Sequence, residues 1–440
     1  MATQRKKLGL GMLIALVTGN MIGSGIFMLP ANLAAFGSIS LFSWIFTGTG
    51  ALLLALVFSR LSLFVPNKSG GPYTYAHEGF GKFVGFQTGY CYWVNIWVGN
   101  AAIAISCIGY LRVFFPELAS PVVATTTSIV LIWILTFINT RNVRFIGGFQ
   151  VVTTILKLVP IFLIMGFSAR YFHFSYLMQD FNISGQSDFS AFSSAASITL
   201  WAFIGLESAA VVGENVENPK RNIPLATIVG TLIATLVYIS CSMFIMGLIP
   251  AETLSHSTAP FADAAKLIFG SSGAIIVTLG AVIACLGTLN GMILLQGQVS
   301  MAAADDGMFP HIFAKRNRHG MPALGQIITT VMVTGILLFT ISDELTKQFQ
   351  LIALVATSMA IISYFYTALA NIVLLGRENH KISFFNKDIL IALGAAAYSL
   401  WAYAGSGQEV IFYGAILLVT SIVLYTWLLF IRNREGERIK

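Results

Sequence analysis

Long apolar segments separated by short polar ones run along the whole chain. About 20 helical residues, each rising about 1.5 Å, cross the hydrocarbon core of a bilayer. By this measure the pattern predicts twelve membrane-spanning helices, at about residues 8–36, 39–63, 84–115, 121–138, 145–169, 190–213, 224–249, 272–301, 322–341, 349–376, 388–404 and 409–431. The polar segments are too short to bury a core of their own. We therefore expect an all-α membrane protein with residues 1–440 in one transmembrane domain.

Composition and charge agree with this pattern. Hydrophobic residues make up 56% of the chain and charged residues 10%, against about 25% charged residues in soluble domains. With Arg5, Lys6 and Lys7 in the cytoplasm, most of the 25 basic residues fall in segments on that side, which places both termini there. The first apolar run is too long for a signal peptide and is taken as a retained span. Topology explains the net charge of +7, so it indicates no nucleic-acid partner.

Three small residues, Gly23, Ser24 and Gly25, interrupt the first predicted span. One interpretation is a packing site, because small residues let a neighbouring helix approach closely. The other is a helix broken in mid-membrane, whose free amides from Gly23 to Ile26 face an anion such as a carboxylate. Hydropathy alone does not separate the two interpretations.

A second interruption lies in the sixth predicted span, where Gly205 precedes Glu207. Glu207 is the only acidic residue that we place deep in a span; it is either a capping partner at a local helix end or a proton-linked gate. Two broken helices five spans apart predict an inverted repeat, with halves at about 8–169 and 190–376 and extra helices at about 388–431.

Lys157 lies far from either end of the fifth predicted span. A lysine at that depth costs several kcal/mol unless it finds protein or water partners. Either the helix is shifted so that the ammonium reaches the interface, or Lys157 is a proton site or a fixed cation that replaces a metal ion.

Residues for other chemistry lack the required spacing. The four cysteines fall in apolar runs without a CxxC pair, and the six histidines include no metal-ligand motif. No Ser, His and Asp set or carboxylate pair suggests hydrolysis. We therefore expect no enzyme activity, no metal and no cofactor.

Four motifs together resemble the amino acid, polyamine and organocation superfamily. They are Gly-Ser-Gly-Ile-Phe at 23–27, Phe-Ile-Gly-Leu-Glu-Ser at 203–208, Glu-Asn-Pro-Lys-Arg-Asn-Ile-Pro at 217–224 and Ala-Asp-Asp-Gly-Met-Phe-Pro at 304–310. The chain is most similar to the bacterial arginine/agmatine and related basic amino acid antiporters. The resemblance implies that both broken helices bind a substrate that carries a carboxylate and an ammonium group.

The resemblance also implies roles for single residues. Ser24 and Gly25 would hold the substrate carboxylate, and an aromatic lid would be formed by Trp201. The α-ammonium would bind the main-chain carbonyls of Met21, Trp201 and Ile204. Glu207 would be a proton-sensitive gate, and Asn100 would contact the far end of the substrate side chain.

Two departures bear on the substrate. Met292 stands where the arginine/agmatine antiporter has a tryptophan, and a thioether lacks the π-face that binds a flat cation. Lys157 resembles instead the lysine of proton-coupled exchangers in the same superfamily. A neutral or broader substrate range therefore gains weight.

We expect a secondary amino acid transporter of the bacterial inner membrane that works as an exchanger, with an amine counter-substrate or a proton. The alternatives are a proton-coupled symporter of broad or neutral specificity and a membrane amino acid sensor. The last two spans are expected to pack on lipid or on a second copy of the chain, as in a homodimer.

Overall fold

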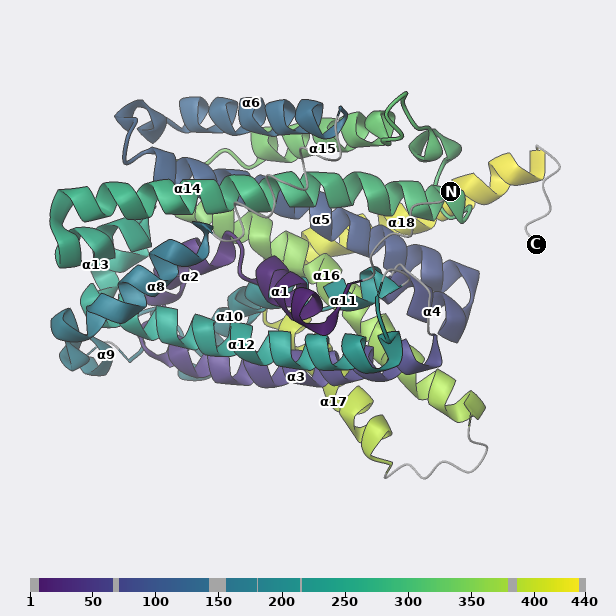
Figure 1. Cartoon of the computed structure of the whole chain (residues 1–440), viewed down its shortest axis with the longest axis horizontal. Coiled ribbons are helices and arrows are strands. Elements are labelled where there is room, and N and C mark those ends of the chain that lie inside the picture. The colour runs from purple at the N-terminus through teal and green to yellow at the C-terminus, as the bar shows by residue number, and fades with distance from the viewer. Residues whose placement is uncertain are drawn as a thin grey trace.

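The computed structural model describes residues 8–65, 71–141, 156–179, 181–213, 216–378 and 386–434, and apart from one isolated bridge their regular elements are helices (Figure 1). The long helices are α3 (Ile39–Phe64), α5 (Lys82–Leu111), α6 (Pro121–Asn139), α12 (Pro219–Leu248), α14 (Pro260–Asp305), α15 (Ala323–Phe339), α16 (Leu345–Glu378), α17 (Lys387–Ala404) and α18 (Gln408–Arg434). Short helices are α4 (Pro72–Phe80), α8 (Leu158–Phe167), α9 (Phe174–Gln179) and α13 (Ala251–Ser255). The all-α prediction is confirmed.

Two of the predicted spans are broken. The first consists of α1 (Leu10–Met21) and α2 (Gly25–Ala34), whose axes differ by 41°. The other consists of α10 (Asp188–Leu200), the 3₁₀ turn η3 (Trp201–Phe203) and α11 (Ser208–Val211). Between η3 and α11, Gly205 has φ of 105°, a conformation that strongly favours glycine. The structure therefore agrees with the second interpretation of the first interruption, a broken helix.

Within the described residues, eight helices are long and apolar enough to cross a membrane, and the α1–α2 pair counts as a ninth. The helices α8 and α15 are apolar but shorter. The predicted span at 145–169 lies partly outside the described residues, as far as residue 155. The chain is a multi-span membrane protein, and the number twelve stays a prediction.

The element α14 begins at Pro260, before the predicted start of the eighth span at residue 272. Its first turns carry the exposed polar residues Asp263 and Lys266, which a hydropathy search assigns to a loop. At Gly270 the backbone is not helical, with φ of 70° and ψ of −166°, so α14 consists of two helices that meet at a kink, and the predicted start directly follows this kink.

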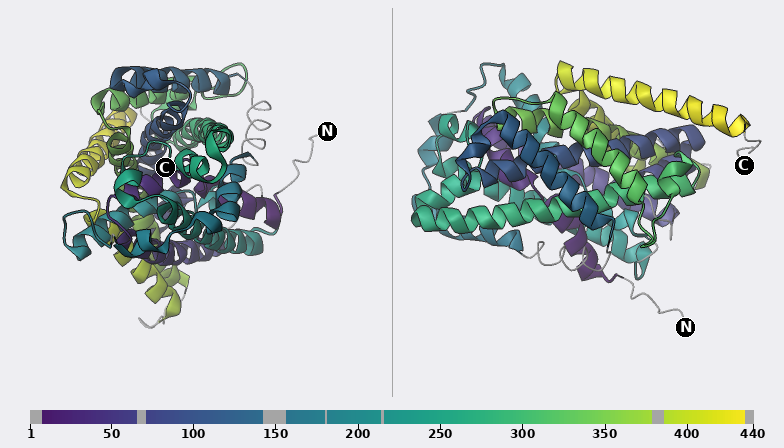
Figure 2. Two further views of the ribbon diagram at one scale, coloured as in Figure 1. Left: turned by 90° about the vertical axis from the view of Figure 1, so that its left-hand side faces the viewer. Right: turned by 90° about the horizontal axis from the view of Figure 1, so that it is seen from above.

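The helix α5 lies at the centre of the molecule and packs along α14 and α16. Figures 1 and 2 show α6 and α15 side by side at one edge, α3 and α12 side by side at the other, and α18 along the outside. Since nearly all of α5 is buried, its side chains reach the interior from one long, rigid element.

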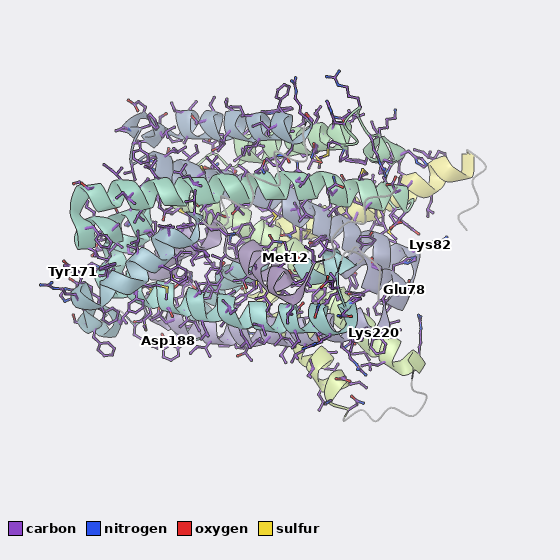
Figure 3. All side chains as sticks on the ribbon, viewed as in Figure 1. Met12, Glu78, Lys82, Tyr171, Asp188 and Lys220 are labelled. Carbon is purple, nitrogen blue, oxygen red and sulfur yellow. The ribbon has the colours of Figure 1, made fainter. Side chains whose placement is uncertain are left out.

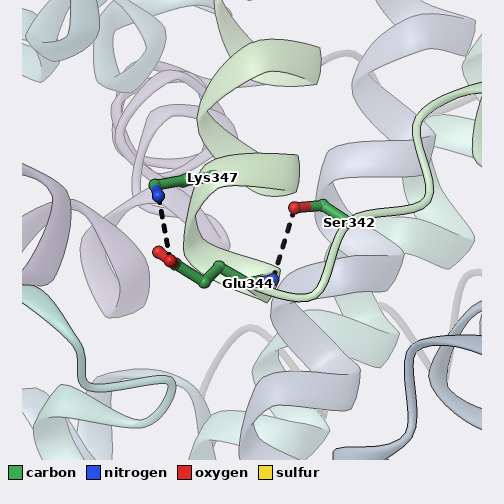
Figure 4. Close-up of polar contacts among 3 residues, drawn as sticks. All are labelled: Ser342, Glu344 and Lys347. Carbon is green, nitrogen blue, oxygen red and sulfur yellow. Dashed lines mark hydrogen bonds and ion pairs between the residues drawn. The ribbon is translucent and has the colours of Figure 1, made fainter.

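Polar residues mark the two ends of the helices. Figure 3 shows Glu78, Lys82 and Lys220 at one end and Tyr171 and Asp188 at the other. The start of α16 is an example of local capping: Ser342 Oγ accepts a hydrogen bond of 3.3 Å from the Glu344 amide, and Lys347 pairs with the Glu344 carboxylate at 2.9 Å (Figure 4). Such contacts satisfy helix termini at the membrane surface.

Candidate substrate-binding site

A cavity lies where the two broken helices meet. Residues of both breaks, of α5 and of α14 line it. The predicted site residues Met21, Ser24, Gly25, Trp201, Ile204, Glu207 and Met292 are all in its wall. The fold thus brings together residues as far apart in the chain as Met21 and Met292, and their roles remain predictions.

At the first break, α2 begins at Gly25 with Ser24 as its preceding residue. The first amides of a helix have no partner within the helix, and the helix dipole adds partial positive charge there. Because Ser24 and Gly25 line the cavity, this end of α2 is suited to a carboxylate.

The Met21 carbonyl, predicted to bind an ammonium group, already has two partners. It accepts hydrogen bonds from the Gly23 amide at 2.7 Å and from Tyr238 Oη at 2.6 Å. Both lone pairs are used in this conformation, so an ammonium group would have to displace one donor. Sequence reasoning missed Tyr238; the signal was a phenol in mid-span, which needs a hydrogen-bond partner when it is buried.

At the second break, the buried Glu207 carboxylate accepts hydrogen bonds from Tyr364 Oη at 2.7 Å and from the Gly205 amide at 3.2 Å. Tyr364 belongs to α16 and was not predicted. The two breaks are joined directly, because Asn20 Nδ2 donates to Ser208 Oγ at 2.8 Å. Glu207 thus links the broken helix to α16, as a gate or as a structural partner.

Trp201 lies between the first break and α5. A Cβ atom added at Gly25 would be 2.9 Å from Trp201 Cδ1, and one added at Gly99 would be 3.0 Å from Cη2. Glycine at both positions therefore makes room for the indole ring, whose two ends touch different elements.

Asn100, predicted to contact the far end of the substrate, does not line the cavity. It is fully buried and donates to Gln296 Oε1 on α14 at 2.7 Å. The cavity-lining residues of α5 are Tyr92, Asn95, Ile96, Gly99 and Ile103. At about 100° per residue, Asn100 lies about 80° from the middle of this set, at the edge of the cavity-lining face, and its amide is turned to α14.

Lys157 lines a second cavity that adjoins the first. Asn20, Tyr92 and Met292 are among the residues that line both. The Lys157 side chain is 3% exposed, and its ammonium donates to the Gly19 carbonyl in the last turn of α1. A cation at the C-terminal end of a helix is stabilised by the helix dipole.

Comparisons with known proteins place the chain in a family. The family model for amino acid permease matches residues 8–435. The chain is 35% identical over 426 residues to the putrescine transporter PotE of Haemophilus influenzae, covering 97% of this chain and 98% of that protein. It is 35% identical over 367 residues to the cadaverine/lysine antiporter of Escherichia coli K12, covering 82% of each. The chain belongs to the amino acid permease family and is a multi-pass membrane transport protein, not an enzyme.

Proposed function

We propose that the protein exchanges a basic amino acid for a diamine across the bacterial inner membrane. The observation that carries this proposal is the charge of the central cavity: among the described residues that line it, Glu207 is the one acidic residue and there is no Lys or Arg. A desolvated cation needs a compensating charge or dipole, whereas an anionic substrate would meet a carboxylate. The named functions of the relatives, putrescine transport and cadaverine/lysine antiport, agree with a cationic substrate.

In this proposal the amino acid carboxylate binds the amides at Ser24 and Gly25, and carbonyls of the breaks, including that of Ile204, receive the α-ammonium. Trp201 covers the substrate, since its ring contacts both Gly25 and Gly99. A diamine has ammonium groups at both ends and competes for the same space without using the carboxylate site. Competition for one cavity is what an exchanger requires.

The proposed topology has both termini in the cytoplasm and two inverted repeats, at about 8–169 and 190–376, in a single transmembrane domain over residues 1–440. The strong bias of basic residues in the sequence supports the orientation. We also propose that the last two helices pack on lipid or on a second copy of the chain, and the many exposed apolar residues of α18 suit either neighbour.

Proton-coupled symport is the second candidate, and Lys157 is the observation that favours it. Its ammonium is buried next to the substrate cavity, and a Gly19 carbonyl is its partner. Release of a proton from such a lysine could accompany substrate release.

Proteoliposomes test these functions directly. We expect purified protein to take up labelled lysine or ornithine rapidly when the vesicles contain putrescine or cadaverine, and slowly when they are empty. Accumulation in empty vesicles under a proton gradient would instead establish symport, and binding without any uptake would establish a sensor. Exchange of neutral amino acids with no effect of cationic ones would overturn the cationic substrate.

A further inference from the structure

Asn95 has an unsatisfied hydrogen-bonding group next to the substrate cavity. Its side chain lines the cavity and is 3% exposed. Its Oδ1 atom is buried and has no hydrogen-bond partner among the described residues. Other buried amides of the described residues also lack a partner, but among the residues that line this cavity Asn95 has the buried side-chain atom without one. An unpaired amide oxygen costs free energy, and at a cavity a ligand can supply the missing donor.

The position of Asn95 relative to Trp201 suggests which part of the ligand it meets. Asn95 precedes Gly99 by four residues, so both lie on the same face of α5. The Trp201 ring has one end at Gly25 in the first break and its other end at Gly99. A substrate that lies along this ring, with one end at the break, therefore has its other end on the Asn95 side of the cavity.

The other polar groups near this far end of the substrate already have hydrogen-bond partners. The Glu207 carboxylate is held at the second break by Tyr364 and the Gly205 amide, and Tyr92 interacts with the same carboxylate. The remaining cavity-lining residues of α5, namely Ile96, Gly99 and Ile103, have no polar side-chain atom. Asn95 Oδ1 is thus the unpaired side-chain acceptor on this face of α5.

We propose that Asn95 Oδ1 accepts a hydrogen bond from the terminal ammonium group of the transported basic amino acid or diamine. Asn95 then adds to the charge of Glu207 in distinguishing these cations from neutral molecules of the same length. This inference rests on the proposed function, because it needs a substrate with an amino group at its far end.

Two matched pairs of competitors test it. Norleucine has the same linear chain as lysine but no terminal ammonium group, and pentylamine differs from cadaverine in the same way. In proteoliposomes that contain putrescine, each compound competes with labelled lysine for uptake. For the wild-type protein we expect lysine to inhibit at a concentration at least about tenfold lower than norleucine, and cadaverine at one at least about tenfold lower than pentylamine. A factor of this size corresponds to one hydrogen bond to a charged group.

In Asn95→Leu we expect this preference to fall about tenfold or more, because the acceptor is lost. Asn95→Ala serves as the second variant if the leucine protein is not monodisperse in detergent. Asn95→Asp keeps an acceptor and should keep or increase the preference. Asn32→Leu is the matched control, because Asn32 is also 3% exposed but donates to Met28 within α2 and does not line the cavity.

Unchanged preference in both the leucine and the alanine variant would overturn the role of Asn95 while leaving the proposed function intact. Failure of the proposed function has a different signature: wild-type vesicles would exchange no basic amino acid and no diamine. An equal loss of preference in Asn32→Leu would also overturn the assignment, because it would show a general effect of removing a buried amide.

Discussion

At the scale of single residues, the main chain positions two side chains of the candidate site, Trp201 and Lys157. The two glycines at the ends of Trp201, Gly25 and Gly99, give the indole ring its space. The buried Lys157 contributes an ammonium group, held by the Gly19 carbonyl. Substitutions at Gly99 and at Lys157 therefore test the roles of these two side chains in transport.

Replacing Gly99 by alanine should weaken substrate binding. The added Cβ would lie 3.0 Å from Trp201 Cη2, and the ring cannot slide away because its other end contacts Gly25. Overpacking of this kind costs about 1–3 kcal/mol, so we expect the KM for exchange to rise about tenfold. Gly11→Ala is the control, because nothing lies within 4 Å of its added Cβ. Equal KM values for the two variants would show that Trp201 does not contact the substrate.

Lys157→Ala should abolish transport or change its pH dependence without unfolding the protein. The substitution removes the cation from the C-terminal end of α1, whose dipole it compensates. The measurement is the initial uptake rate between about pH 5 and pH 9 for both proteins, with size-exclusion profiles as the folding control. If the rate and the pH profile match the wild type, Lys157 is a structural residue.

At the scale of elements, different faces of α5 line the cavity and contact neighbouring helices. One face lines the cavity, while Asn100 faces α14 and bonds to Gln296. Tyr110, near the end of the same helix, donates to the Phe27 carbonyl of α2 at 2.9 Å and accepts from the Phe261 amide of α14 at 3.2 Å. A central helix thus holds the broken helix and α14 together.

The Asn100–Gln296 contact predicts a double-mutant result. Either Asn100→Leu or Gln296→Leu alone leaves a buried amide without its partner, which costs about 1–3 kcal/mol. The double variant removes both amides, and we expect its unfolding midpoint in detergent to recover to near that of the wild type. Additive losses would mean that the two side chains do not form a pair.

At the scale of the whole molecule, the cavities are closed at one end and extend toward the other. Phe27, Tyr110 and Phe261 are fully buried beside the start of α2, with Phe27 and Phe261 ring centroids 5.1 Å apart. The second cavity extends along α1 and α11, past Leu16 and Val212. If α1 begins in the cytoplasm, as the charge bias indicates, this conformation faces inward.

Cysteine labelling tests this orientation, and the four native cysteines are all buried. Gln298→Cys places a thiol in the second cavity, and Lys266→Cys places one at the opposite, exposed end of α14. A membrane-impermeant maleimide should label Cys at 298 faster in inside-out vesicles and Cys at 266 faster in right-side-out cells. The reverse pattern would place the termini outside.

Much of the architecture followed from the sequence. The apolar runs indicated the helices. The two interruptions, at residues 23–25 and 205–207, indicated a pair of broken helices because they lie five spans apart and the second carries a carboxylate deep in the membrane. The ends of helices were harder to predict: the polar turns of Asp263 and Lys266 look like a loop, yet they are helical and are separated from the rest of α14 by the kink at Gly270.

Partnerships between helices were decided by the tertiary structure alone. The sequence shows Asn95 and Asn100 as equivalent amides in one span, but helix rotation turns the first to the cavity and the second to Gln296. It likewise gives no sign that Tyr238 bonds to Met21, or Tyr364 to Glu207. Hydrophobic pattern fixes which segments enter the membrane, since that depends on each segment's own transfer free energy. Which polar groups meet depends on the rotation and neighbours of each helix, and these are set only when all the helices pack together.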